Sequence, residues 1–154
     1  MKKLLILAGA LAIGTSAAAQ EFYGGLTLDY AKPHSGDSQT AASLLGGVMF
    51  GGPVFKYGAE LDFGLPLAGD TDYDTTRLRA MASYDFGDYA AIAGAGVVQY
   101  DTPLGDVDGQ SLSLGVQRAI SDRILLRGEF IRDFMDDGVA DTTTTRVGAV
   151  YRFY

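Results

Sequence analysis

From residue 21 onward, the chain alternates two kinds of side chain with a period of two residues. In segment 54–65, apolar residues such as Leu61 alternate with charged residues such as Glu60 and Asp62. This period is typical of β-strands whose two faces meet different surroundings. It predicts eight strands, separated alternately by tight turns and by longer loops. The expected strands cover residues 21–32, 40–51, 54–65, 75–86, 89–100, 109–120, 124–134 and 142–154, with the longer loops at 33–39, 66–74, 101–108 and 135–141.

The N-terminus has the pattern of a secretory signal peptide. Lys2 and Lys3 precede an apolar run at residues 4–13, and small residues follow at 17–19. This predicts a signal peptide at residues 1–19 and one domain at residues 20–154. The absence of Cys excludes disulfide and thiolate chemistry. Nineteen acidic residues against twelve basic ones argue against a nucleic-acid partner, because phosphate contacts need basic patches.

Alternation alone does not say which face points inward, since a soluble lipocalin-like barrel also alternates, with apolar residues inside. Aromatic residues near the strand ends, with Leu, Val, Ile, Ala and Gly between them, favour the opposite arrangement. Short turns on one rim and longer loops on the other also favour it. The prediction is therefore an all-β, eight-stranded antiparallel up-and-down transmembrane barrel with both termini at the periplasmic rim. The expected aromatic girdle comprises Phe22, Tyr30, Phe50, Phe55, Phe63, Tyr84, Phe86, Tyr100, Phe134, Tyr151 and Phe153.

The last strand carries a spaced pattern of a polar residue, a glycine and two aromatic residues. These are Arg146, Gly148, Tyr151 and Phe153. With this ending, the chain resembles the small eight-stranded outer-membrane β-barrels of the OmpA transmembrane-domain and OmpX type. The resemblance implies a place in the outer membrane of a Gram-negative-type cell and insertion by the barrel-assembly machinery. It does not imply one biochemical activity.

The charged faces predict ion pairs inside the barrel. A hairpin centred near Asp70 would place Asp62 opposite Arg77 and Glu60 opposite Arg79, and a hairpin centred near Gly138 would place Glu129 opposite Arg146. Eight strands leave room for little more than side chains. We therefore expect a lumen filled by charged pairs, and the alternative is a small porin-like channel.

The longer loops are acidic and contain neither Lys nor Arg. Asp70, Asp72 and Asp74 place three carboxylates at alternate positions, which makes them candidates for a divalent cation, although the Gly and distal Glu of known Ca²⁺ loops are missing. Lys32 and Arg132 lie at the loop ends of their strands. There they are candidates for contact with lipopolysaccharide phosphates.

Catalysis has little support in the sequence. The one histidine, His34, precedes Ser35 and lies near Asp37 on a flexible type of loop, whereas a nucleophile and its base need a fixed geometry. We expect no enzyme activity and no cofactor, with a lipid-modifying enzyme as the remaining alternative. The predicted role is structural or surface-interactive, through envelope integrity, lipopolysaccharide contact or adhesion.

Overall fold

The computed structural model describes residues 19–69, 73–103, 105–136 and 139–153. The predicted signal peptide lies outside these residues, except for Ala19. No helix in the described part of the chain is long and apolar enough to cross a membrane. The strands are β1 (Ala19–Pro33), β2 (Gln39–Gly51), β3 (Phe55–Gly69), β4 (Asp74–Asp85), β5 (Tyr89–Thr102), β6 (Gly105–Ala119), β7 (Ile124–Met135) and β8 (Thr142–Phe153).

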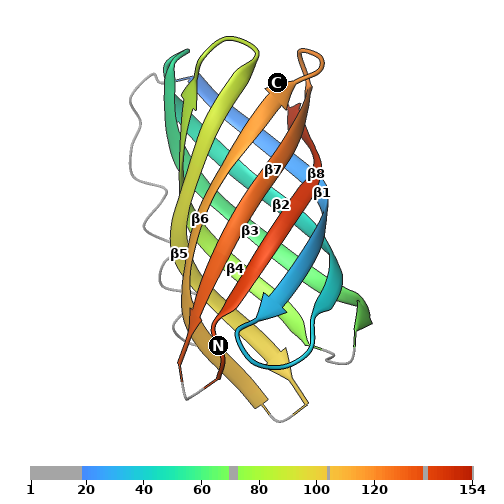
Figure 1. Cartoon of the computed structure of the whole chain (residues 1–154). Coiled ribbons are helices and arrows are strands. Elements are labelled where there is room, and N and C mark those ends of the chain that lie inside the picture. Colours follow the sequence, from blue (N-terminus) through green and yellow to red (C-terminus); the bar gives the residue numbers. More distant parts are fainter. Residues whose placement is uncertain (1–18, 70–72, 104, 137–138, 154) are drawn as a thin grey trace.

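The eight strands form one closed barrel, which confirms the predicted fold (Figure 1). Each strand pairs antiparallel with its neighbours in sequence, and β1 also pairs with β8, so that Phe22 lies opposite Phe153. Closure leaves no strand edge unpaired. β1 begins and β8 ends at the same rim as the turns at residues 52–54, 86–88 and 120–123, at the top of Figure 1. This end is called the short-turn rim below, and the opposite end the loop rim.

The barrel is apolar outside and charged inside. Leu26, Leu114 and Phe130 expose 66–69% of their surface, whereas Arg79 and Arg146 expose 1% and 0%. A soluble barrel would have the reverse distribution, because exposed apolar surface is costly in water. The structure therefore assigns the charged face of the alternation to the lumen.

The strands extend further into the loop rim than the sequence predicts. β3 continues to Gly69, and the expected long loop at 101–108 is wrong, since β5 ends at Thr102 and β6 begins at Gly105. Asp101 lies opposite Asp106 within this ladder. The acidic residues indicate that this segment lies in solvent. The strands nevertheless continue beyond the apolar belt, because pairing between them satisfies the peptide N–H and C=O groups. Gly105 has φ of 128°, a left-handed conformation that suits the tight turn.

One member of the expected aromatic girdle is placed wrongly. Tyr100 is only 3% exposed and points into the lumen, while its neighbour Gln99 lies on the other face of β5. Tyr100 shares the parity of Val98 and Ile92, which are also buried. The period of two therefore outweighs the preference of aromatic residues for strand ends.

Candidate functional site: a charged network that fills the lumen

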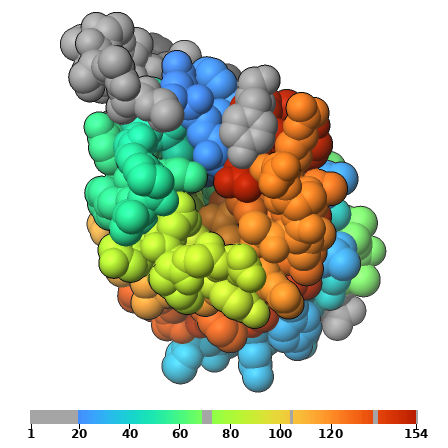
Figure 2. All heavy atoms as spheres, turned by 90° about the horizontal axis from the view of Figure 1, so that it is seen from above, coloured from blue at the N-terminus to red at the C-terminus, as the bar shows by residue number. Residues whose placement is uncertain are grey.

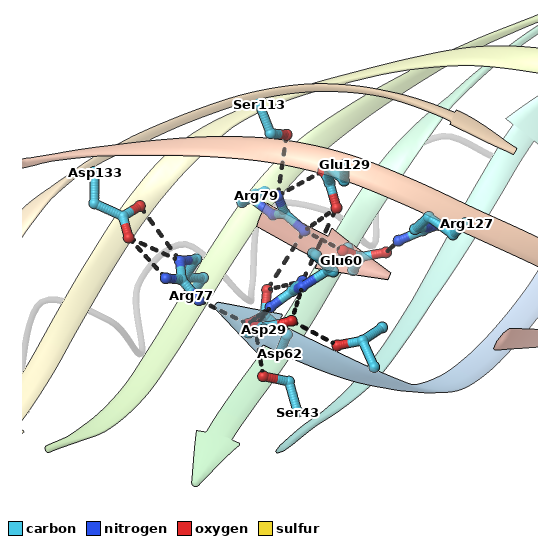
Figure 3. A network of polar contacts seen from close by, with 12 residues as sticks. Asp29, Ser43, Glu60, Asp62, Arg77, Arg79, Ser113, Arg127, Glu129 and Asp133 are labelled. Carbon is cyan, nitrogen blue, oxygen red and sulfur yellow. Dashed lines mark hydrogen bonds and ion pairs between the residues drawn. The ribbon is translucent and has the colours of Figure 1, made fainter. Parts of the chain in front are cut away.

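Nine charged side chains meet in the middle of the barrel and are called the lumen network below (Figure 3). They come from five strands (β1, β3, β4, β7 and β8), and the alternation, which turns every second residue inward, brings them together. Each is at most 4% exposed. The members are Asp29, Glu60, Asp62, Arg77, Arg79, Arg127, Glu129, Asp133 and Arg146.

Arg79 on β4 lies at the centre of the lumen network and binds across the lumen. Its guanidinium contacts Glu60 on β3 at 2.5 Å and Glu129 on β7 at 2.8 Å, and it also donates to the Ser113 hydroxyl at 3.0 Å. Arg127 binds the second oxygen of Glu60. One carboxylate thus joins two arginines from opposite sides of the barrel.

Arg146 joins the last strand to the first. Its Nε and Nη2 atoms donate to the two oxygens of Asp29 at 2.8 Å and 2.7 Å, and Nη2 also contacts Asp62 at 3.0 Å. The Ser43 hydroxyl donates to Asp29 at 2.8 Å. This bidentate pair spans the β1–β8 seam, where Asp29 lies opposite Arg146.

Arg77 forms the part of the lumen network nearest the loop rim. It binds Asp133 on β7 at 2.7 Å and Asp62 at 3.3 Å, and the Tyr100 hydroxyl donates to Asp133 at 2.7 Å. The Tyr73 ring stacks on Tyr100 with a centroid separation of 4.6 Å. Burial raises the pKa of the Tyr73 phenol above its ordinary value, so this aromatic cap stays uncharged at neutral pH.

The lumen network balances charge closely, with five carboxylates against four guanidinium groups. Buried charges are stable only when they are paired and hydrogen-bonded, and here every member contacts at least one opposite charge. Eight-stranded barrels have an interior just wide enough for side chains to fill, and these paired side chains occupy its middle.

The hairpin register places Glu60 opposite Arg79, Asp62 opposite Arg77 and Glu129 opposite Arg146. The shortest contacts do not all follow that register. Glu129 lies 4.0 Å from its cross-strand partner Arg146 but 2.8 Å from Arg79 on the far side of the lumen.

Sequence reasoning missed Asp133 as a member of the lumen network. It also missed Tyr23 and Tyr100, whose hydroxyl groups donate hydrogen bonds to carboxylates of the network. Tyr23 donates to Glu60 at 2.9 Å. Parity alone could have found Asp133, because it lies two positions beyond Ile131 and four beyond Glu129 on the inward face of β7.

The two basic candidates at the loop rim lie beside one another. Lys32 on β1 and Arg132 on β7 both lie opposite Thr143 of the intervening strand β8. They line an outer groove of about 300 Å³ together with Tyr30, His34 and Thr145. Arg132 already has partners, since it donates to Thr143 at 2.7 Å and to Asp141 at 3.1 Å.

The remaining candidates are not brought into one site. Asp70 and Asp72 lie outside the described residues, and Asp74 is exposed. Within the described ranges, no group of three His, Cys, Asp or Glu side chains is placed to hold a metal ion. His34 and Ser35 are exposed on the loop between β1 and β2.

The four residues of the C-terminal pattern divide between the two faces of β8. Tyr151 and Phe153 are exposed outside with ring centroids 5.1 Å apart, while Arg146 belongs to the lumen network. A side chain at Gly148 would place its Cβ 2.3 Å from the Leu26 carbonyl oxygen, so a glycine allows the seam between β8 and β1 to close.

Solved structures similar to this chain include small outer-membrane barrels, although no protein-family model and no curated protein matches its sequence. Neisserial surface protein A superposes with a TM-score of 0.62 at 15% identity, over 90% of this chain and 100% of that one. Ail, the attachment invasion locus protein of Yersinia pestis, gives 0.59 at 13%, over 90% and 100%. The N-terminal barrel domain of Pseudomonas aeruginosa OprF gives 0.59 at 10%, over 85% and 97%. The chain has the fold of the small eight-stranded outer-membrane β-barrels.

Proposed function

We propose that this chain is an integral outer-membrane protein with a structural or surface-interactive role and a lumen closed to solutes. The observation that carries the proposal is the inverted barrel, with a lumen network of buried ions inside a continuous apolar exterior. Strands of 12 to 15 residues are long enough to cross a hydrocarbon layer of about 25 Å when tilted. The short-turn rim is assigned to the periplasm and the loop rim to the cell exterior.

Fractionation and conductance test this proposal together. The protein should appear in the outer-membrane fraction, and its unboiled band should migrate differently from its boiled band. In planar bilayers, the folded form should show no stable conductance, because the lumen network obstructs the pore. A protein recovered from the soluble periplasm would refute the membrane assignment, whereas a steady solute-sized pore would support the porin-like alternative.

The groove beside Lys32 supports lipopolysaccharide contact as the more specific role. Two cationic side chains from β1 and β7 lie one strand apart at the proposed outer rim, and the Tyr30 ring is beside them. Phosphate groups are suited to such a pair, since charge-assisted hydrogen bonds are the strong ones. The acidic residues at the loop rim, such as Asp74 at the start of β4, are a proposed second route, through divalent cations that bridge to the same phosphates.

Replacing either basic residue should weaken lipopolysaccharide binding. We expect Lys32→Gln and Arg132→Gln each to lower the affinity of the nanodisc-embedded protein for lipopolysaccharide by about two- to fivefold at low salt, as for exposed ion pairs. The matched control is Arg118→Gln, which removes one exposed positive charge at the other rim. Equal losses in all three variants would show that net charge, and not this groove, governs binding.

The C-terminal aromatic pair is proposed to be recognised by the barrel-assembly machinery. Changing Tyr151 and Phe153 to Gln should reduce the amount of folded protein in the outer membrane, because these rings are exposed and available on the last strand. Phe134→Gln, also an exposed aromatic but at the loop rim, should have a smaller effect than Phe153→Gln. Normal levels of the double variant in a quantitative membrane immunoblot would contradict the proposal.

A catalytic role is not proposed. His34 and Ser35 are both exposed on the loop between β1 and β2, whereas general base catalysis needs an oriented partner for the histidine. No cofactor is required for the proposed role.

A further inference from the structure

The groove beside Lys32 contains a third side chain that can carry a positive charge. His34 lines this groove together with Lys32 and Arg132, and it is the one histidine of the chain. Lys32 and His34 are two positions apart, and the alternation of an extended chain turns such residues to the same face. Figure 2 looks along the barrel from the short-turn rim, and the light-blue part of β1 that leads to His34 projects at its lower edge. The imidazole is exposed, so it lies at the outer surface beside two permanent cations.

The backbone of His34 is held against the last strand. Its N–H group donates to the Asp141 carbonyl oxygen at 2.8 Å, and Pro33 before it lies opposite Thr142 of β8. Proline also restricts its own φ angle. His34 is therefore positioned at the seam between β1 and β8, while its exposed ring stays within reach of a ligand.

The groups near the imidazole leave the groove with an excess of positive charge. They come from β1, β7 and the loops at either end of the seam. The charged and titratable ones are Tyr30, Lys32, Arg132 and Asp141, with Asp37 exposed three positions further along the loop of His34. Lys32 and Arg132 against Asp141 give one net positive charge, and a protonated imidazole would add a second. Cations in one groove repel one another, whereas a phosphate between them is attracted by each. A bound phosphate therefore favours the charged imidazole, and by reciprocity the charged imidazole favours the bound phosphate.

We infer that His34 is a third ligand of the phosphate group in this groove and that it makes binding stronger in acid. The protonated imidazole donates a charge-assisted hydrogen bond to a phosphate oxygen, whereas the neutral ring adds no charge. Histidine is the side chain whose charge ordinarily changes between about pH 5 and 8, so binding strengthens as the pH falls through this range. The inference rests on the proposed contact with lipopolysaccharide and adds the regulation of that contact by pH.

The ratio of two affinities, taken at two pH values, tests the inference. Binding of lipopolysaccharide to the protein in nanodiscs of zwitterionic lipid is measured at about pH 5.5 and about pH 8, on either side of the histidine range, at one low ionic strength. The wild type should bind about two- to fivefold more tightly than His34→Gln in acid, as for an exposed ion pair, and equally at the higher pH. The phosphate group itself loses charge near pH 6, but this change cancels in a ratio taken at one pH. A ratio that is the same at both pH values would overturn the inference.

Two further variants provide matched controls. His34→Lys keeps its positive charge at both pH values, so it should bind more tightly than His34→Gln at both. The double variant His34→Gln/Ser35→His moves the imidazole to the next residue, which is exposed but does not line the groove. It should not recover the gain in acid. No gain in His34→Lys, or full recovery in the double variant, would refute a contact made in the groove.

The single imidazole also gives a direct readout. In protein without a histidine tag, labelled with ¹³C in the histidine ring, one ring signal is expected. At about pH 6.5, within the histidine range, lipopolysaccharide should move this signal toward the position of the protonated ring. Inorganic phosphate at the same concentration of phosphate groups should move it less, because a lipid anchor raises the local concentration of its head group. An equal movement with inorganic phosphate would identify a free ion as the ligand and overturn the assignment to a lipid.

Failure of this inference is distinguishable from failure of the proposed function. If Lys32→Gln and Arg132→Gln weaken binding at both pH values while His34→Gln has the same effect at both, the lipopolysaccharide contact stands and the role of His34 is wrong. If none of these three variants weakens binding, the groove is not the site and both proposals are refuted.

Discussion

Replacing Arg79 with methionine should destabilise the barrel by about 3–5 kcal/mol, the usual cost of removing one partner of a buried ion pair. Arg79 is 1% exposed and holds Glu60 at 2.5 Å and Glu129 at 2.8 Å. Among the described residues, its loss leaves Glu129 with one ionic partner, Arg146, which lies 4.0 Å away. Urea titration of the protein folded in lipid vesicles, followed by the heat-modifiable band, measures the change in unfolding free energy.

The control for this variant is Arg118→Met, which removes an exposed arginine on the next strand but one. It should change the unfolding free energy by no more than about 0.5 kcal/mol. Adding Glu129→Gln to Arg79→Met should recover part of the loss, because a neutral amide removes one unpaired charge. If Arg79→Met were as stable as Arg118→Met, the lumen network would not contribute to stability in the way described.

A charge on the outer face should be costly at mid-height and nearly harmless at the rim. We expect Leu114→Arg to lower the unfolding free energy in lipid vesicles by about 2–4 kcal/mol, and Ile120→Arg by about 0–1 kcal/mol, following the depth dependence in a bilayer. Leu114 is 69% exposed near the middle of β6, and Ile120 is 55% exposed just past its end. The two residues are therefore matched in exposure and differ in depth.

The same pair of variants discriminates a membrane-embedded barrel from one that stands in water. In water, an exposed leucine changed to arginine has little cost, so both variants would be close to wild type. Equal stabilities would therefore contradict immersion of the apolar belt. If the two variants differ in stability by the same amount in lipids with different head groups, the effect comes from depth in the hydrocarbon layer.

The sequence predicts the strands well because one period runs through almost the whole chain. Residues such as Glu60 and Leu61 differ so strongly in polarity that the strand and its two faces follow directly. To decide which face points inward, the sequence analysis also needed the aromatic residues near the strand ends and the loop lengths. Tyr100 is a position where the aromatic signal gives the wrong face. Aromatic preference for strand ends is statistical, whereas alternation is imposed by the geometry of the backbone.

The site was predictable within hairpins and not across the lumen. The position of a turn determines which residues face each other on adjacent strands, as for Asp62 and Arg77. The contact between Arg79 and Glu129 joins strands that are not neighbours, so it depends on the diameter of the barrel and on side-chain length. The apolar cluster of Met49, Met81 and Val150 was equally hidden. Met81 follows Arg77 and Arg79 on the inward face of β4, and β2 has no charged residue to mark its inward face.

The seam between β1 and β8 has a consequence for the order of folding. Asp29 and Arg146 are 117 positions apart, yet they share a bidentate contact. A partly folded sheet that lacks β8 would hold the Asp29 carboxylate beside an open edge without this cation, and closing so long a loop is entropically slow. Pairing of β8 with β1 therefore removes the open strand edge and neutralises the Asp29 carboxylate in the same step. Any intermediate in which β8 is not yet paired keeps both an open strand edge and an Asp29 carboxylate without its cation, which favours an all-or-none final step.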